Sequence, residues 1–204
     1  MKKIILSLFT IFTFSLASGG CVLVQSGDMN VTWKAYKTLA KVGVGGAFSS
    51  VKYVPVAKEG KNFADLLVGS TVSIDTTQLN TGNPARDTTL VKMFFKQLKS
   101  TSIEGKIVAM KAAKRVKGQP HTGVLDVMLT MNGKTLTIPM QYHYEKEHFK
   151  AMGTLDIFDF AGDVALTTIN KSCYDLHKGK TWNDVSIMFS TNIKATLCNV
   201  KIKK

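Results

Sequence analysis

Apolar and polar residues alternate along most of this 204-residue chain. Alternation with a period of two predicts strands that bury one face, because successive side chains of a strand point to opposite faces. The dipeptide Asn132-Gly133 lies between two such runs and is the strongest hairpin signal in the sequence. The predicted strands cover residues 31–36, 41–48, 68–75, 103–113, 123–131, 136–144, 149–160 and 185–193.

About eight strands separated by turns predict an all-β fold, either a closed antiparallel barrel or a sandwich. Periodicity alone does not separate these two architectures. We expect residues 22–28 to form a linker or an edge strand, residues 62–67 a short helix or irregular rim, and residues 165–176 a helical turn or loop.

The stretch 74–98 departs from this pattern, because it begins as a strand and continues with helical spacing. The Asn83 side chain is suited to cap a helix, and Pro84 suits the first helical position. A helix with one apolar stripe must cover something. We therefore expect either a lid packed on the sheet or a helix that closes one end of a cavity. The stripe consists of Leu90, Val91, Phe94, Phe95 and Leu98.

The first residues have the pattern of a secretory signal peptide. Lys2 and Lys3 precede an apolar run at 4–16, which is shorter than the roughly 20 residues of a membrane span. We expect cleavage after Ala17 and a periplasmic or secreted protein, with lipidation of Cys21 as the alternative. The expected organisation is a signal peptide at 1–17, a linker or edge segment at 18–30 and one β-barrel domain at 31–200.

The chain is strongly basic, with 27 Lys and Arg residues against 14 Asp and Glu residues and a formal charge of +13. Such a surface suits anionic headgroups or acidic partners, although a solvated surface is the simpler explanation. Nucleic acid is a poor partner, because we expect export and find no nucleic-acid-binding motif.

Three cysteines, Cys21, Cys173 and Cys198, leave one unpaired if a disulfide forms after export. Because terminal strands often meet where a sheet closes, we favour the pair Cys21–Cys198 over Cys173–Cys198. The absence of a Cys-x-x-Cys motif argues against thiol–disulfide catalysis.

No constellation with catalytic or metal-binding spacing appears. His143 and His148 are five residues apart, which is not the spacing that puts two metal ligands on one helical face. Asp156 and Asp159 would point to opposite faces of a strand. The Gly-x-Ser-x-Gly motif of a nucleophilic serine is also missing. We therefore predict a binding protein rather than an enzyme, without a metal or cofactor.

Two stretches resemble the YceI-like polyisoprenoid-binding family. The first runs from Leu79 to Phe95 and contains Thr81-Gly82-Asn83, Arg86-Asp87, Leu90 and Phe94-Phe95. The second, residues 129–135, is similar to the family's Leu-Thr-x-x-Gly-x-Thr hairpin.

Three positions depart from the family pattern. Thr89 stands where members usually carry His, Lys96 stands where Asp follows the phenylalanine pair, and Val127-Met128 replaces a glycine before the hairpin. We therefore assign no role here that depends on that His or Asp.

The resemblance implies an extended, lipocalin-like antiparallel barrel of eight strands with a short helix. Its lumen would hold a long-chain amphiphile such as a polyisoprenoid, an isoprenoid quinone or a fatty-acid derivative. The headgroup would lie near the rim, beside Asn80, Arg86, Tyr142 or a lysine. The candidate ligand-binding residues are Trp33, Phe48, Val72, Ile74, Leu79, Asn80, Arg86, Leu90, Phe94, Phe95, Leu129, Ile138, Met140, Tyr142, Ile157, Phe160, Ile187 and Phe189.

Two other functions stay open from the residues alone. An enzyme acting on the same lipid predicts polar groups that converge inside the barrel. A structural or adhesion module predicts a solid core and salt-sensitive binding to acidic partners. Transient contact with a membrane surface and a homodimer also stay open.

Overall fold

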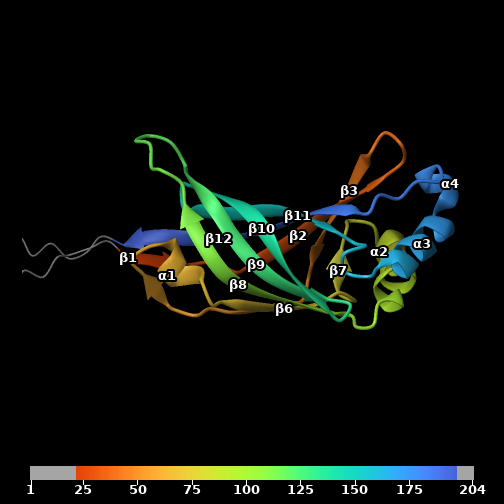
Figure 1. Cartoon of the computed structure of the whole chain (residues 1–204), viewed down its shortest axis with the longest axis horizontal. Coiled ribbons are helices and arrows are strands. Elements are labelled where there is room, and N and C mark those ends of the chain that lie inside the picture. The colour runs from red at the N-terminus through yellow and green to blue at the C-terminus, as the bar shows by residue number, and fades with distance from the viewer. Residues whose placement is uncertain (1–21, 197–204) are drawn as a thin grey trace, which may run out of the picture.

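A curled antiparallel sheet makes up most of the molecule (Figure 1), and the computed structural model describes residues 22–196. Eight of its strands contain five residues or more, in agreement with the predicted eight. Four further strands are short: β1 (Val22–Gln25), β4 (Val51–Val54), β5 (Glu59–Gly60) and β7 (Leu79–Asn80). The long strands are β2 (Asn30–Lys37), β3 (Val42–Phe48), β6 (Thr71–Asp75), β8 (Ser102–Ala112), β9 (His121–Met131), β10 (Lys134–Glu145), β11 (His148–Asp156) and β12 (Asp184–Thr196).

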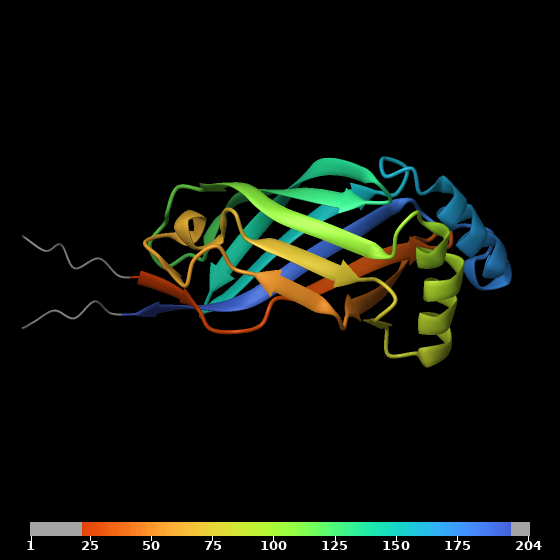
Figure 2. The same ribbon diagram turned by 90° about the horizontal axis from the view of Figure 1, so that it is seen from below.

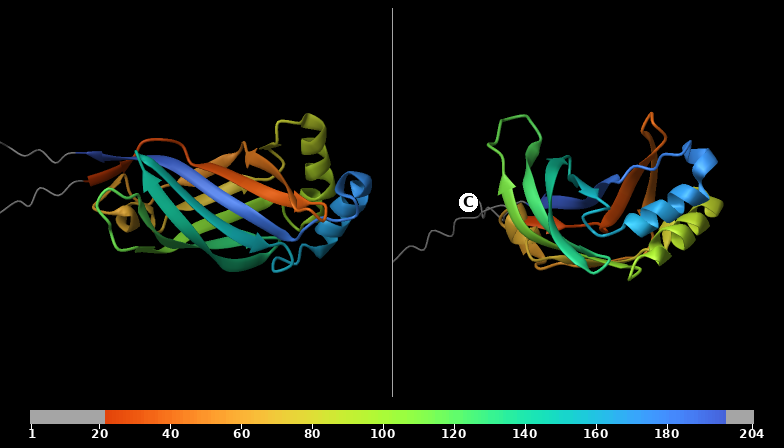
Figure 3. Two further views of the ribbon diagram at one scale, coloured as in Figure 1. Left: turned by 90° about the horizontal axis from the view of Figure 1, so that it is seen from above. Right: turned by 45° about the vertical axis from the view of Figure 1, so that its right-hand side comes forward.

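The strand order brings distant parts of the chain together. Neighbouring strands follow the order β4-β6-β8-β9-β10-β11-β12-β2-β3-β7, and all the pairs are antiparallel. β3 and β4 lie near opposite ends of this order, yet Ser49 and Ser50 alone separate them in the chain. The Ser49 amide donates to Gln78 O (2.8 Å), and the Asp75 amide donates to Ser50 O (3.3 Å). The sheet therefore curls into a half-barrel (Figure 3).

Helices lie at both ends of the curled sheet (Figure 2). Helix α1 (Phe63–Leu67) lies beside β1 at one end. Helix α2 (Pro84–Met93), the 3₁₀ turn η1 (Phe95–Gln97), α3 (Asp163–Ser172) and α4 (Tyr174–His177) lie at the other end, which we call the helical end. None of these helices within residues 22–196 has the length and apolar character of a bilayer crossing.

The predicted capping of α2 is confirmed. Asn83 Oδ1 accepts from the Arg86 amide at 3.0 Å, and Pro84 occupies the first turn. The helix is shorter than its apolar stripe, because it ends at Met93 and the chain tightens into η1. This change of geometry turns Phe95 into the core, where its side chain is only 7% exposed.

The interior beneath α1 is filled with aromatic rings. Phe63 lies 4.8 Å from Tyr144, 5.4 Å from Phe149 and 5.9 Å from Tyr142, measured between ring centroids. Tyr142 also stacks on Phe149 at 5.3 Å. Edge-to-face and stacked pairs of this kind are favourable beyond the area they bury. This end of the half-barrel is therefore a solid core.

One sequence expectation is corrected near the helical end. The strand predicted at 149–160 ends at Asp156, whose carboxylate accepts from the Phe158 amide at 2.8 Å and starts a turn. A side chain that bonds the backbone two residues on competes with strand pairing. Of the two alternatives for residues 165–176, the helical one is present, since α3 covers Asp163–Ser172 and α4 covers Tyr174–His177.

The two described ends of the chain lie side by side, because Val22 pairs with Thr196. The predicted edge strand at 22–28 is present as β1. The signal peptide at 1–17, the lipidation of Cys21 and the pair Cys21–Cys198 fall outside the described residues.

The predicted hairpin at Asn132-Gly133 is confirmed, and the Asn132 side chain also fastens the helical end. Both residues have positive φ (53° and 74°), as a type I′ turn requires. Asn132 Oδ1 accepts from the Lys99 amide (2.8 Å), while Nδ2 donates to Phe160 O (2.8 Å) and Ala161 O (2.9 Å). One buried amide thus connects the β9–β10 hairpin to the segments that follow η1 and β11.

Replacing this amide should destabilise the protein without disturbing the turn. Asn132→Gly keeps the positive φ but removes three hydrogen bonds, each worth about 1 kcal/mol. We expect the free energy of unfolding to fall by about 2–3 kcal/mol in urea titrations. Lys146→Gly is the matched control, because Lys146 also has positive φ (49°) and is exposed. Equal stabilities for the two variants would contradict this role of Asn132.

Candidate functional site

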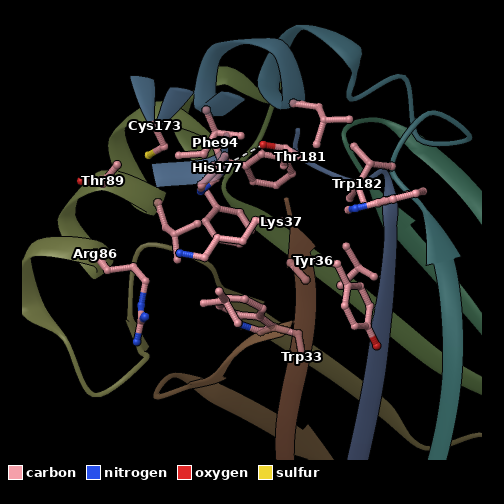
Figure 4. A pocket seen from close by; sticks show the side chains of 18 of the residues that line it. Trp33, Tyr36, Lys37, Arg86, Thr89, Phe94, Cys173, His177, Thr181 and Trp182 are labelled. Carbon is pink, nitrogen blue, oxygen red and sulfur yellow. Dashed lines mark hydrogen bonds between the residues drawn. The ribbon is translucent and has the colours of Figure 1, made fainter. Parts of the chain in front are cut away.

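The helical end encloses a cavity of about 470 Å³, which we call the main cavity (Figure 4). Its walls come from β2, β3, β11, β12 and the helices α2, α3 and α4. Exposed residues of α4 (Leu176) and of the start of α2 (Asn83 and Ala85) line it, so the cavity reaches solvent beside these two helices. Eight predicted ligand-binding residues line it: Trp33, Phe48, Arg86, Leu90, Phe94, Phe95, Ile157 and Ile187.

A smaller cavity of about 70 Å³, which we call the inner cavity, lies between strands that include β6, β8, β9 and β12. Ile187 of β12 lines both cavities, so the two spaces adjoin at this side chain. The inner cavity is also lined by five more of the predicted residues, Val72, Ile74, Leu129, Met140 and Phe189.

The other five predicted residues line neither cavity. Tyr142 belongs to the aromatic core beneath α1, and the Asn80 side chain accepts from the Gly82 amide at 2.7 Å to form the turn before α2. Neither is therefore placed to meet a headgroup at the opening. Leu79, Ile138 and Phe160 are buried in the packed core.

Helices α3 and α4 and the segment before β12 contribute a wall of the main cavity that the sequence did not predict. The lining includes Leu166, Ile169, Cys173 and Leu176, which follow helical spacing. That spacing was the available signal, and it is weak because the stretch is short and interrupted. Trp182 from the next segment completes the wall and donates its indole N–H to Thr38 O at 2.7 Å.

Arg86 and Asp87 shape the turn that leads into α2. Arg86 Nε donates to Thr81 Oγ1 (2.9 Å) and Nη2 donates to Thr81 O (2.7 Å). The Asp87 carboxylate accepts from the Thr81 amide at 3.0 Å and from the Thr81 hydroxyl. The pair therefore has a structural role at this turn, while Arg86 also lines the main cavity.

Trp33 forms one wall of the main cavity, and its indole packs directly on Gly46 of β3. Only glycine fits at this position without a shift of its neighbours, because a Cβ there would lie 2.7 Å from Trp33 Cζ2 and 2.9 Å from Thr81 Cγ2. Trp33 is 9% exposed, and its Nε1 donor has no partner within residues 22–196.

His177 is held in one orientation by a short chain of hydrogen bonds. The Thr181 hydroxyl donates to Asn170 Oδ1 (2.8 Å), so its oxygen must accept from His177 Nδ1 at 2.6 Å. This assigns the proton of the neutral imidazole to Nδ1. Burial, and to a smaller extent the Lys37 ammonium, lower the pKa of His177 and favour this neutral form. Burial raises the pKa of the nearby Cys173 thiol, which Lys37 opposes.

The sequence pattern of the YceI-like domain matches residues 24–194, which is most of the chain. The chain belongs to the YceI-like family. No curated protein sequence matches it.

Solved structures share the fold of this YceI-like protein. A polyisoprenoid-binding domain from Saccharophagus degradans superposes with a TM-score of 0.55 at 11% identity, covering 86% of this chain and 98% of that chain. BcnA from Burkholderia cenocepacia gives 0.53 at 15% identity, with coverages of 83% and 99%. A mutant YceI protein from Campylobacter jejuni gives 0.51 at 18%, with coverages of 75% and 85%. At these identities the likeness concerns the fold.

Within residues 22–196, no cluster of three His, Cys, Asp or Glu side chains is arranged to hold a metal ion. Cys173 has no cysteine partner in the same part of the chain. The groups that converge on the main cavity are mostly hydrocarbon, with a few donors near its opening.

A methyl group at Gly46 should disturb the Trp33 wall. Gly46→Ala forces the indole or Thr81 to move, and overpacking of this kind costs about 1–3 kcal/mol. Gly45→Ala in the same strand is the matched control, because its Cβ would lie 3.4 Å from its nearest neighbour, Trp33 O. We expect urea titrations to show a loss of stability for Gly46→Ala alone. A similar loss in both variants would point to a general strand effect.

Two half-buried histidines should make the YceI-like protein sensitive to acid. Burial lowers the pKa of His177 and also that of His121, which the Arg115 charge lowers further. Between these folded-state values and the unfolded value near 6.5, the unfolded chain binds more protons, so stability falls as pH falls. We expect His177→Gln to flatten the dependence of unfolding free energy on pH between 7.5 and about 5. The exposed His148→Gln should keep the original slope.

Proposed function

We propose that this YceI-like protein binds a long-chain amphiphile, with the tail in the main and inner cavities and the headgroup at the opening beside α2 and α4. The observation that carries this proposal is the difference between the two ends of the half-barrel. Aromatic rings fill the end beneath α1, whereas the helical end keeps about 470 Å³ open behind largely apolar walls. This volume lies within the range of small-molecule sites.

Hydrocarbon contact is sufficient to hold such a ligand. Each buried CH₂ group contributes about 0.8 kcal/mol, so a tail of about a dozen carbons gains on the order of 10 kcal/mol before the entropy of association is subtracted. The tail needs no charged contact along its length. Lys106 is the one charged residue among those that line the inner cavity.

The ligand class follows from the family and the shape together. The structural relative from Saccharophagus degradans is described as a polyisoprenoid-binding domain. Polyisoprenoids, isoprenoid quinones and fatty-acid derivatives all have the long apolar tail that the two adjoining cavities suit. We extend the proposal to a carrier that is exported to the periplasm or beyond the cell, on the strength of the charged and apolar N-terminal pattern at 1–17.

Native mass spectrometry of the protein recovered after export, without detergent, tests both parts. We expect a polypeptide mass that corresponds to cleavage after Ala17, together with an additional mass of a bound amphiphile that organic solvent releases. An intact leader would contradict export. A protein that neither carries an apolar ligand nor takes up geranylgeraniol would contradict the binding function.

A variant that occupies the main cavity should abolish uptake while the fold survives. Ala35 lines the cavity, and Ala35→Phe places a ring in open space rather than in packed core. We expect at least a tenfold loss of 1-N-phenylnaphthylamine binding, followed by fluorescence, because the ring takes the volume the probe needs. Ala112→Phe is the matched control, since Ala112 is exposed on β8 and lines neither cavity. Equal binding by both variants would place the ligand elsewhere.

A further inference from the structure

The opening of the main cavity carries positive charge without negative charge. Among its lining side chains, Lys37 and Arg86 are cationic, and none is Asp or Glu. Lys37 lies at the end of β2, and Arg86 lies in the first turn of α2. Figure 4 shows them on different walls of the same space, with Trp33 below and His177 above.

Neither cation forms a salt bridge within residues 22–196. No carboxylate lies within 4.0 Å of either side chain, whereas Lys41 in the neighbouring turn pairs with Asp184 at 2.7 Å. Arg86 and Asp87 both hydrogen-bond the Thr81 hydroxyl, so the Asp87 carboxylate offsets part of the Arg86 charge. The Lys37 charge therefore remains available to a ligand, and Arg86 adds a smaller share.

The surroundings add to this potential. The Lys37 ammonium group lowers the pKa of both Cys173 and His177, because it lies near the wall formed by α3 and α4. Asn83 and Ala85 at the N-terminus of the ten-residue helix α2 also line the cavity. The N-terminus of a helix carries partial positive charge. The buried, unpaired Trp33 Nε1 is one more donor in the same wall.

We propose that the opening selects amphiphiles with an anionic headgroup, a carboxylate or a phosphate, held between Lys37 and Arg86. This inference rests on the proposed binding function and specifies the class of its ligand. A neutral alcohol or amide fills the same hydrocarbon space but leaves the Lys37 ammonium without a counter-charge. Because the opening is partly hydrated, the gain is that of a screened ion pair and falls as salt rises.

Two matched pairs of ligands test the inference. Geranylgeranyl phosphate against geranylgeraniol, and palmitate against palmitamide, keep the tail and change the headgroup charge. Displacement of 1-N-phenylnaphthylamine at pH 7.5 gives the affinity of each. We expect the anion of at least one pair to bind about tenfold tighter than its neutral partner in low salt, with the ratio shrinking in 0.5 M NaCl. The pair that shows the preference identifies a prenyl phosphate or a fatty carboxylate as the source.

Lys37→Met removes the charge and keeps most of the side-chain length. We expect it to abolish the preference for the anion, measured as the ratio of the affinities within each matched pair. Lys150→Met is the control, because it makes the same change in net charge on an exposed strand position outside both cavities. A preference that survives in Lys37→Met would overturn the role of Lys37.

The outcomes separate this inference from the function on which it rests. Equal affinities for charged and neutral partners in the wild-type protein would overturn the selection of an anion, while lipid binding would stand. Failure of all four ligands to displace the probe would overturn the binding function itself.

Discussion

A curled sheet with an apolar inner face must be covered at both of its ends, and this requirement organises the rest of the molecule. The end near the chain termini meets it with packing, since Phe63 from the short helix α1 enters between Tyr144 and Phe149. The other end meets it with helices laid across the strands. These helices close the end of the sheet but leave space beneath them, because only their inward side chains project into the interior. The cavity is therefore a consequence of how that end is covered.

The strands and helix α2 were accessible from the sequence because their signals are local. Alternation identifies which side chains of β9, β10 and β12 face inward, and Asn83-Pro84 marks the beginning of α2. Such signals do not state how deeply a side chain is packed. Tyr142 and Trp33 both occupy inward-facing positions of their strands. Tyr142 is packed in an aromatic cluster, however, whereas Trp33 borders the main cavity.

The part of the site that was missed depends on tertiary contacts. The segment that carries Cys173 and His177 reads only as a short helical stretch with one apolar side. Its position over the cavity follows from pairing between the β2–β3 region and the segment before β12, where the Thr38 amide donates to Lys180 O and the Trp182 amide to Tyr36 O. These contacts join residues more than 140 positions apart. Likewise, the lack of a salt-bridge partner for Lys37 within residues 22–196 becomes visible only once its neighbours are known.

The pairing of Val22 with Thr196 places both ends of the described chain at the end of the sheet that carries α1, whereas the helices that line the main cavity lie at the opposite end (Figure 2). A tether joined ahead of Val22 would therefore hold the molecule at the end that carries α1, and the helical end with the cavity opening would point away from the tether. The long axis of the half-barrel would set how far that entrance stands from the point of attachment.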